Sequence, residues 1–425
     1  MAVYEKYKDS GDSHIGMIPE HWVDVPISAL FYEKSDKGHP EFKVLSVYRE
    51  YGVIEKDSRD DNHNVTSEKT ETYKAVNSGD FVINKMKAWQ GSMGLSAYKG
   101  IVSPAYITCV FRNDSNNRWY IHYLLRSNSY IAHYNRLSYG IRVGQWDMHF
   151  EDFKRLRVFL PTRSEQDRIV SYIESKSAEI DTAIAQQQKM IDLLNERKRI
   201  IIQNAVTRGL NPDIKLKDSG IDYIGDIPTN WAVKKLKYVA TYNDEALDEN
   251  ADKHLQIEYV EIGDVFWGRG ITNSTTYAFK DAPSRARRIA HKNDIIISTV
   301  RTYLKAAALI ERDGLVVSTG FAVIRPSKQI HPGYLSYAIL SENFVDEVQK
   351  ISIGVSYPAC NAIDIMNLKI ALPDYDEQKQ IAEWLNERVQ WIENQIKSIE
   401  KRIEFLQERK RIIINEAVTG KIKVS

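Results

Sequence analysis

The chain of 425 residues repeats itself, and this repeat constrains its fold more than any other feature. Residues 9–22 (DSGDSHIGMIPEHW) recur as residues 218–231 (DSGIDYIGDIPTNW), and residues 196–207 (ERKRIIIQNAVT) recur as residues 408–419 (ERKRIIINEAVT). The offsets are 209 (218 − 9) and 212 (408 − 196), so the chain consists of two copies of one unit. The ends of the two copies are alike, whereas their middles have diverged.

The order of the repeated segments predicts that the two copies close into a ring. The second copy stops soon after its AVT block, whereas the first runs on through VTRGLNPDIKLKDSG, which ends like the N-terminal YEKYKDSG. Joined end to end, the two copies would form a closed pair of near-equivalent units. We therefore expect the two termini to lie close together and the molecule to have a pseudo-twofold axis.

Each copy ends in a long segment with a helical pattern. No proline or glycine occurs between Ser164 and Asn204, which predicts a helix of roughly 60 Å at about 1.5 Å per residue. The apolar positions follow a heptad spacing typical of coiled coils, with one polar position in the first copy: Ile392, Ile396, Ile399, Ile403 and Leu406, matched by Ile180, Ile184, Gln187, Ile191 and Leu194. Two matched heptad helices in one chain most simply pair with each other. The alternative is a solvated amphipathic helix packed on its own domain.

The divergent middles predict one α+β domain in each copy. Each is about 150 residues long, the size of an ordinary domain, and mixes short β runs such as FVINK and DIIISTV with helical stretches. The predicted fold is α+β, with two mixed α/β domains separated by two long antiparallel helices that form a coiled coil. The expected boundaries are 1–162, 163–208, 209–374 and 375–425.

Composition limits the kind of surface that the chain can present. Lys and Arg number 58 against 57 Asp and Glu, a net charge of +1, so an anion-binding face must be local or shared with a partner. The two cysteines, Cys109 and Cys360, show no CxxC spacing and exclude a disulfide framework or zinc ribbon. No apolar run reaches membrane-spanning length and the start has no signal-peptide pattern, so we expect a cytoplasmic protein with no membrane partner.

Catalytic and metal-binding motifs are missing from the sequence. There is no GxxxxGK[ST] phosphate loop, no GxGxxG after a strand and no HExxH. The SPAY tetrapeptide (103–106) resembles the base-holding motif of amino-methyltransferases, but Ala105 replaces its second proline and no glycine-rich loop precedes it. PDYDEQK (373–379) contains the residue types of a nuclease site, but it falls at a predicted helix start, where acidic residues stabilise the helix dipole. We predict no catalytic and no metal-binding residue.

The first copy carries a basic and aromatic stretch. Residues 115–146 contain four arginines and no Asp or Glu, interleaved with tyrosine and tryptophan. Part of the aromatic set, including Tyr120, Tyr123 and Tyr134, is expected on the core face of a helix. The loop GIRVGQW (140–146) differs because two glycines bracket Arg142 and Gln145 follows, which are residue types that read base edges.

The second copy has a basic strip of its own between residues 280 and 305, with seven Lys and Arg against two Asp. Such runs are often only solvated faces, but two local patches in a neutral chain favour a surface that follows a duplex. Aligning residues 79–89 with 293–303 makes Arg301 the counterpart of Lys87. The predicted DNA-contacting residues are Lys85, Lys87, Arg126, Arg136, Arg142, Gln145, Arg285, Arg287, Arg288, Arg301, Tyr303 and Lys305.

The isoleucine triplets near the helix ends predict a protein partner. Three consecutive isoleucines cover most of a helix circumference, which is more than one coiled-coil contact buries. The predicted partner-binding residues are Ile200, Ile201, Ile202, Ile412, Ile413 and Ile414.

These features together resemble the specificity subunit of type I restriction-modification enzymes. The resemblance covers essentially the whole chain and rests on the paired DSGxxxIGxIPxxW starts, the two ERKRIII…AVT ends, and two E-Q-x-x-I helix starts at Glu165-Gln166 and Glu377-Gln378. It implies two target-recognition domains (1–162 and 209–374), each reading one half of a bipartite site in double-stranded DNA. The helices would set the spacer and dock two methylation subunits, and motor/nuclease subunits would join them.

The same resemblance implies that this chain is not catalytic alone and holds no cofactor. S-adenosylmethionine, ATP and magnesium would then belong to the partner subunits. Two alternatives from other classes stay open. One is a coiled-coil scaffold that binds only protein, with its basic strips merely solvated. The other is a stand-alone adenine methyltransferase, which the missing cofactor loop opposes.

Overall fold

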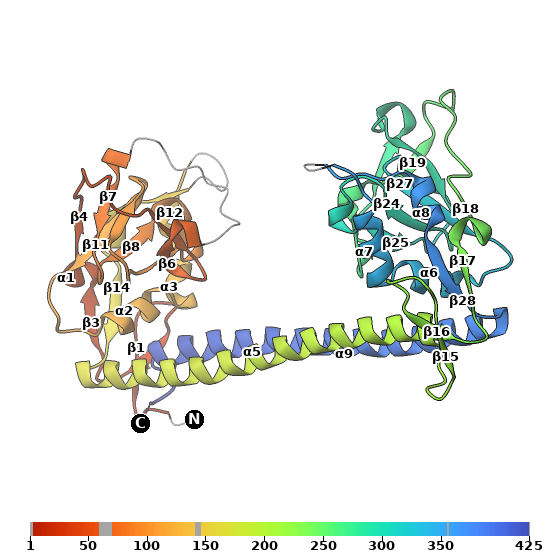
Figure 1. The fold of residues 1–425 in the computed structure, drawn as a ribbon. Helices are drawn as coiled ribbons and strands as arrows, with labels where there is room; N and C mark the ends of the chain where they lie inside the picture. Colours follow the sequence, from red (N-terminus) through yellow and green to blue (C-terminus); the bar gives the residue numbers. More distant parts are fainter. Residues whose placement is uncertain (1–2, 59–69, 141–145, 355–356, 425) are drawn as a thin grey trace. The chain divides into compact units, whose positions relative to one another are not determined.

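A computed structural model gives the fold of the chain, and it describes residues 3–58, 70–140, 146–354 and 357–424. The chain divides into two compact units (Figure 1). Unit 1 contains residues 1–187 and 401–425, and unit 2 contains residues 188–400. Each combines a mixed α/β domain with parts of two long helices, α5 (Arg163–Arg208) and α9 (Tyr375–Val418). The predicted fold class is therefore confirmed.

The centre of unit 1 is a four-stranded antiparallel sheet. Its strand order is β4 (Phe31–Lys34), β11 (Tyr106–Phe111), β8 (Phe81–Asn84) and β9 (Met93–Leu95). All four residues of β8 are buried, as expected for a short, mostly apolar strand inside a sheet. The helical stretch predicted in this copy folds as α2 (Arg118–Leu125) and α3 (Asn128–Leu137), and both helices pack into the same core.

Shorter elements complete unit 1. The elements that precede β11 along the chain include β1 (Tyr7–Asp9), β2 (Met17–Pro19), β3 (Val23–Pro26), α1 (Ile27–Leu30), β5 (Leu45–Tyr48), β6 (Gly52–Glu55), β7 (Lys74–Val76), the 3₁₀ helix η3 (Lys85–Gln90) and β10 (Gly100–Val102). Those after it are β12 (Ser138–Tyr139), β13 (Asp147–Met148), α4 (Phe150–Phe153) and β14 (Arg157–Leu160), which leads into α5. Residues 104–105 form the turn between β10 and β11, so the SPAY segment is a strand connection.

Unit 2 repeats the central sheet of unit 1 strand for strand. Its order is β18 (Ala240–Tyr242), β27 (Phe321–Pro326), β24 (Ile295–Ser298) and β25 (Ala307–Leu309). The shared topology shows that the divergent middles are one fold. A second four-stranded sheet follows the order β22 (Thr275–Ala278), β19 (Gln256–Val260), β26 (Leu315–Ser318) and β23 (Ala286–Ala290).

The other elements of unit 2 surround these two sheets. They are β15 (Leu216–Asp218), β16 (Asp226–Pro228), β17 (Ala232–Lys235), β20 (Val265–Phe266), β21 (Gly270–Ile271), the 3₁₀ helix η7 (Thr302–Leu304), α6 (Pro332–Ile339), α7 (Glu342–Lys350), α8 (Ala362–Asn367) and β28 (Lys369–Leu372). Residues 267–269 form the turn of the β20–β21 hairpin.

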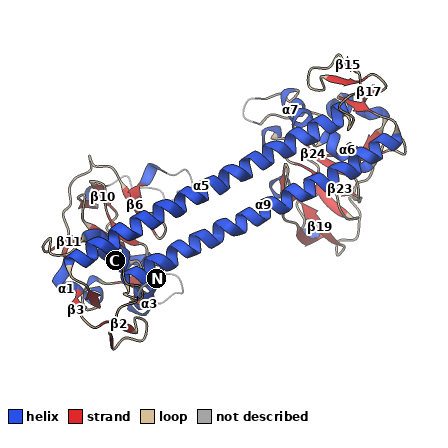
Figure 2. Cartoon of the chain, turned by 90° about the horizontal axis from the view of Figure 1, so that it is seen from below, coloured by secondary structure: helices blue, strands red, loops and turns tan. Residues whose placement is uncertain are grey.

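Helices α5 and α9 run in opposite directions beside each other in both units (Figure 2). In unit 1, Lys410 Nζ lies 2.7 Å from Asp181 Oδ2, and in unit 2, Lys198 Nζ lies 3.4 Å from Glu393 Oε1. Every predicted heptad position is buried or half-buried, including the polar Gln187. The heptad pattern therefore identifies the contact face of both helices.

The N-terminal and C-terminal segments both contribute to the core of unit 1, as the sequence predicts for neighbouring termini (Figure 1). Trp22 shares this core with Val418 and Val424. Lys421 Nζ donates to the backbone oxygens of Ile15 and Met17 at 3.0 and 2.9 Å. Each unit is thus completed by the end of the helix that begins in the other half of the sequence.

The repeated motifs contact one another, which explains why both recur. In unit 1 the indole Nε1 of Trp22 donates to Glu165 Oε1 at 3.3 Å, and in unit 2 the indole of Trp231 donates to Glu377 Oε2 at 2.9 Å. The tryptophan of each IPxxW segment therefore bonds the glutamate of the E-Q-x-x-I segment in the same unit. The motifs define how each long helix attaches to its domain.

The glutamine next to that glutamate fixes the helix start. Gln166 and Gln378 are both about 1% exposed. Gln378 Oε1 accepts from His331 N at 2.8 Å and its Nε2 donates to Pro373 O at 2.9 Å. Gln166 makes the same two bonds, from Asn117 N and to Pro161 O. A buried amide with both ends bonded is a strong local constraint on geometry.

Among the described residues, no helix is long and apolar enough to cross a membrane. Within those same residues, no cluster of three or more His, Cys, Asp or Glu side chains is arranged to hold a metal ion.

Candidate nucleic-acid interface

Both units present the same corner, formed by a buried strand, a short 3₁₀ helix and a return strand. In unit 1 these are β8, η3 and β9, and in unit 2 they are β24, η7 and β25. The turn before each strand is also shared, because Asp80 accepts from Asn77 N and Asp294 accepts from His291 N, both at 2.8 Å. The faint alignment of these segments therefore corresponds to a real structural equivalence.

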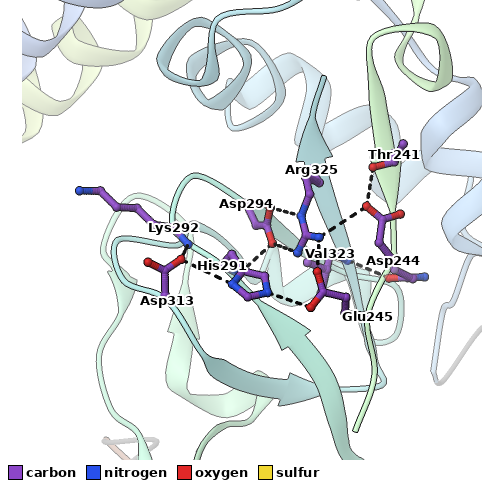
Figure 3. A network of polar contacts seen from close by, with 10 residues as sticks. Thr241, Asp244, Glu245, His291, Lys292, Asp294, Asp313, Val323 and Arg325 are labelled. Carbon is purple, nitrogen blue, oxygen red and sulfur yellow. Dashed lines mark hydrogen bonds and ion pairs between the residues drawn. The ribbon is translucent and has the colours of Figure 1, made fainter. Parts of the chain in front are cut away.

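A network of charged side chains fixes the start of β24 in unit 2 (Figure 3). Arg325 on β27 donates through Nε and Nη2 to the two carboxylate oxygens of Asp294, at 3.0 and 2.8 Å. Asp294 is only 2% exposed, so this two-point contact neutralises a buried carboxylate. The hydrogen bonds to Asp294 raise the pKa of Arg325 above its ordinary value.

The same network reaches the segment after β18. His291 Nε2 lies 3.0 Å from Glu245 Oε2, and Glu245 also pairs with Arg325. Hydrogen bonding to Glu245 raises the pKa of His291, and the same bond lowers the pKa of Glu245. Sequence reasoning did not find this network, because its members come from three separated segments. It holds the strand whose other end leads to η7.

At that other end, η7 is framed by two residues in the left-handed backbone region. Arg301 has φ +52° and Lys305 has φ +51°, and both are non-glycine residues. Such backbone costs free energy and often occurs at functional sites. Arg301 is exposed and its guanidinium lies 5.3 Å from the ring centre of Tyr357. Tyr303 is 47% exposed, whereas Lys305 pairs with Asp346 and lies over the Trp267 ring.

The equivalent corner of unit 1 is built on η3. Lys87 is exposed there, as predicted for a DNA contact, whereas Lys85 Nζ is held by Asp147 Oδ2 at 2.8 Å. Met86 between them is 46% exposed. The corner thus offers one cation and one apolar side chain to solvent.

The arginines in and just before β23 (Ala286–Ala290) differ in their contacts and exposure. A β-bulge between Ala286 and Arg288 makes Arg287 the extra residue of the strand. The Arg287 guanidinium lies 4.9 Å from the Phe279 ring centre. Arg288 is half-buried and burial lowers its pKa, and its Nη1 has no hydrogen-bond partner in the described part of the chain. Arg285 is exposed, so it is the cation of this group that solvent reaches most freely.

Two arginines of unit 1 differ in availability. Arg126, predicted to contact DNA, donates to the backbone oxygens of Arg49 and Glu50 in the β5–β6 turn. Burial lowers the pKa of Arg126 to about 10. In this structure its guanidinium supports the hairpin. Arg136 on α3 is exposed. Arg142 and Gln145 lie outside the described residues.

The tyrosines that were expected on a core face do lie there. Tyr120 and Tyr134 are fully buried, and Tyr123 packs against the core of unit 1. The hydroxyl of Tyr120 donates to Val418 O at 3.1 Å, so it also joins the domain to the end of α9.

The isoleucine triplets are divided between core and surface. Ile413 is 5% exposed, and the neighbours Ile201, Ile202 and Ile414 pack against the cores of their own units. The sequence predicts that part of each triplet meets another chain or a globular domain, and packing within this chain covers Ile201, Ile202, Ile413 and Ile414. Ile200 and Ile412 are 50% and 46% exposed.

Comparison with known proteins shows which proteins this chain is similar to. Residues 228–404 match the family described as the type I restriction modification DNA specificity domain. The MjaVIII specificity subunit of a type I restriction enzyme from Methanocaldococcus jannaschii is 27% identical over 366 residues, covering 82% of this chain and 80% of that one. The EcoDI specificity subunit from Escherichia coli is 21% identical over 315 residues, covering 69% of this chain and 68% of that one.

Solved structures agree on the fold. A chain from a structural study of complex assembly and conformational transition in the type I R-M system matches with a TM-score of 0.65 and 15% identity. The match covers 94% of this chain and 98% of that one. The HsdS subunit from Thermoanaerobacter tengcongensis matches with a TM-score of 0.51 and 15% identity, covering 95% of this chain and 98% of that one. With its duplicated domains, paired long helices and motif contacts, the chain is similar over most of its length to type I restriction-modification specificity subunits, and residues 228–404 match their DNA specificity domain.

Proposed function

We propose that this chain reads a bipartite DNA site, with the α/β domain of each unit contacting one half. The observation that carries the proposal is that the two domains share the topology of their central sheet and the same strand–3₁₀ helix–strand corner, while the side chains on that corner differ. Lys87 and Met86 occupy it in unit 1, and Arg301 and Tyr303 occupy it in unit 2. A shared scaffold with different contact residues suits two half-sites of different sequence.

The charge distribution supports a local DNA contact. The chain carries a net charge of +1, so its affinity for DNA has to come from patches rather than from the whole surface. In unit 2 the residues Arg285, Lys292 and Arg301 are exposed cations, and in unit 1 Lys87 and Arg136 are exposed. Arginine suits phosphate and guanine edges because its planar guanidinium donates two parallel hydrogen bonds. Arg142 and Gln145 stay part of the proposed contact in unit 1.

We assign the docking of two methylation subunits to equivalent patches on the long helices. In unit 2, Leu193 and Ile200 on α5 are 55% and 50% exposed, and in unit 1, Phe405 and Ile412 on α9 are 73% and 46% exposed. Both pairs are seven residues apart, so each lies along one face of its helix. Apolar patches of this kind on a helix already engaged in a coiled coil suit a further helix of a partner.

Two polar atoms strengthen this docking assignment. Gln203 Oε1 and Asn415 Oδ1 are buried and have no hydrogen-bond partner in the described part of the chain. They occupy equivalent positions, at offset 212 (415 − 203), and each follows its exposed isoleucine by three residues. Unpaired buried oxygens cost free energy, which a donor from a partner subunit would recover in both units.

In this proposal the chain supplies recognition and spacing, and the chemistry belongs to its partners. S-adenosylmethionine would be bound by the methylation subunits, and ATP and magnesium by the motor/nuclease subunits. The decisive experiment is reconstitution with the methylation subunit, followed by mapping of methylated sites on genomic DNA. A split motif with a fixed spacer supports the proposal, and a continuous motif contradicts it.

Two further measurements test the alternatives. In a gel shift, the reconstituted complex is expected to bind a duplex that contains the site more tightly than a random duplex, and this binding should weaken as salt rises. The absence of such a shift would favour a protein-binding scaffold. Methyl transfer by the purified chain alone with S-adenosylmethionine would instead favour a stand-alone methyltransferase.

A further inference from the structure

The corner of unit 2 carries an unusual group of exposed apolar side chains. Tyr303 and Leu304 on η7 are 47% and 46% exposed, and Ile353 and Tyr357 in the segment after α7 are 85% and 68% exposed. We call these four residues the apolar tip. Single exposed apolar residues are ordinary on a protein surface, whereas a contiguous group indicates a contact with another molecule.

Hydrogen bonds hold the two segments of the apolar tip together. Thr302, within η7, is 3% exposed, and its Oγ1 donates to Ser352 Oγ at 2.8 Å. Ile353 and Ala359 exchange two backbone bonds of 2.8 and 3.0 Å, and Cys360 N donates to Thr299 O at 2.9 Å. These bonds tie η7 to the described residues 352, 353, 359 and 360 of the second segment.

The backbone of η7 favours presentation over burial. Arg301 and Lys305, which flank η7, are both in the left-handed region; between them Thr302 is buried, whereas Tyr303 and Leu304 are exposed. Because Tyr303 and Leu304 are both about half exposed, they contribute little to the packing of the unbound chain. The positive φ angles of Arg301 and Lys305 are strained. The hydrogen bonds beside η7 and the Asp294–Arg325 contact hold the preceding strand β24 in place and so maintain this strained backbone.

The charges around the apolar tip restrict what it contacts. Lys305 is paired with Asp346 and Lys350 with Glu347, so neither is free for a phosphate. Arg301 has no carboxylate partner in the described ranges, and it stacks on Tyr357. An apolar surface with one cation at its edge suits stacked bases beside a single phosphate better than it suits a phosphate backbone alone.

We propose that the apolar tip inserts into DNA as a wedge, with Leu304 and Tyr303 entering between two base pairs of the half-site that unit 2 reads. This rests on the proposed function. The wedge would unstack one base step, and Arg301 would hold the adjacent phosphate or base edge. Specificity would then come partly from how easily a given step opens, since pyrimidine–purine steps deform most readily.

The test uses the complex reconstituted with its methylation subunit and a duplex of its mapped site, with 2-aminopurine placed at each half-site position in turn. The wild-type complex is expected to raise 2-aminopurine fluorescence several-fold at one step of the unit 2 half-site. Leu304→Ala should abolish that rise and weaken binding about tenfold. Leu255→Ala is the matched control, because Leu255 is also in unit 2 and 41% exposed, and it should change neither quantity.

The outcomes separate this inference from its rivals. Replacing each thymine by deoxyuridine tests a contact with thymine methyl groups; an affinity loss there without any fluorescence rise would overturn the wedge. An unchanged fluorescence rise in Leu304→Ala would also overturn it. If Leu304→Ala prevents assembly with the methylation subunit while the chain stays folded, the tip is a protein contact and the wedge is wrong. Failure of the proposed function is distinct, because the wild-type complex would then show no sequence-specific binding at all.

Discussion

At the scale of single residues, the buried glutamines of the E-Q segments make the sharpest stability prediction. Gln378→Ala removes a side chain that accepts from His331 N and donates to Pro373 O, and leaves both backbone groups unpaired. We expect a loss of about 1–3 kcal/mol in unfolding free energy. Gln380→Ala, at an exposed position of the same helix turn, is the matched control. Equal melting temperatures for the two variants would contradict the assigned role.

Arg301 tests base recognition. If its guanidinium contacts a base edge, Arg301→Ala should cost about 1–3 kcal/mol of binding free energy and relax specificity in one half-site only. Arg301→Lys keeps the charge and loses the planar fork, so it should relax specificity while leaving the salt dependence of binding unchanged. Methylation-site mapping and binding at two salt concentrations measure both. A loss that is uniform over all sequences would make Arg301 a phosphate contact.

The His291–Glu245 pair predicts a pH dependence of stability. A histidine whose pKa is raised above the ordinary 6.5 stabilises the fold below that value, and the contribution disappears as pH rises through the folded pKa. Glu245, with its pKa lowered from 4.5, contributes above that value and loses its contribution as pH falls. His291→Gln should therefore lower the melting temperature more at about pH 6 than at about pH 8.5. The exposed His254, changed to Gln, is the control; equal differences at both pH values would refute the prediction.

At the scale of elements, sequence reasoning succeeded where a pattern is long and failed where a contact is distant. The helices α5 and α9 were predictable because a heptad spacing extends over uninterrupted sequence. The strands were only approximately predictable, since most have three to six residues and carry little periodicity. The hydrogen bond from Arg126 to the backbone oxygen of Glu50, 76 residues earlier, was not predictable, because nothing in the sequence near Arg126 signals it. Comparing the two copies position by position would have drawn attention to Leu304.

The helix faces carry a prediction of their own. Ile200→Asp and Ile412→Asp place a charge on exposed positions, so the chain should stay folded and lose a methylation subunit. Ile413→Asp places the same charge at a position 5% exposed, and should destabilise unit 1 itself. Size-exclusion chromatography with light scattering, together with thermal unfolding, separates the two effects. Full assembly of the double variant Ile200→Asp/Ile412→Asp would remove these residues from the docking patch.

At the scale of the whole molecule, the closed order of the repeat has a consequence for recognition. Each unit needs the end of the helix that begins in the other copy, as the packing of Val418 with Trp22 and of Val206 with Trp231 shows. Under the proposed function, the length of the two helices would set the distance between the half-sites, as in a molecular ruler.

The ruler itself is testable by changing helix length. Four residues inserted near Gln187, with four more near its counterpart Ile399, add about 6 Å to each helix at about 1.5 Å per residue. They nearly preserve the heptad face, because four residues are close to one turn. The half-site sequences should stay the same while the spacer lengthens by about one or two base pairs, at about 3.4 Å each. Insertions of two residues rotate the contact face by roughly half a turn and should abolish methylation. Site mapping for the wild type and both variants measures this, and an unchanged spacer with full activity in the four-residue variant would show that the helices do not set the distance.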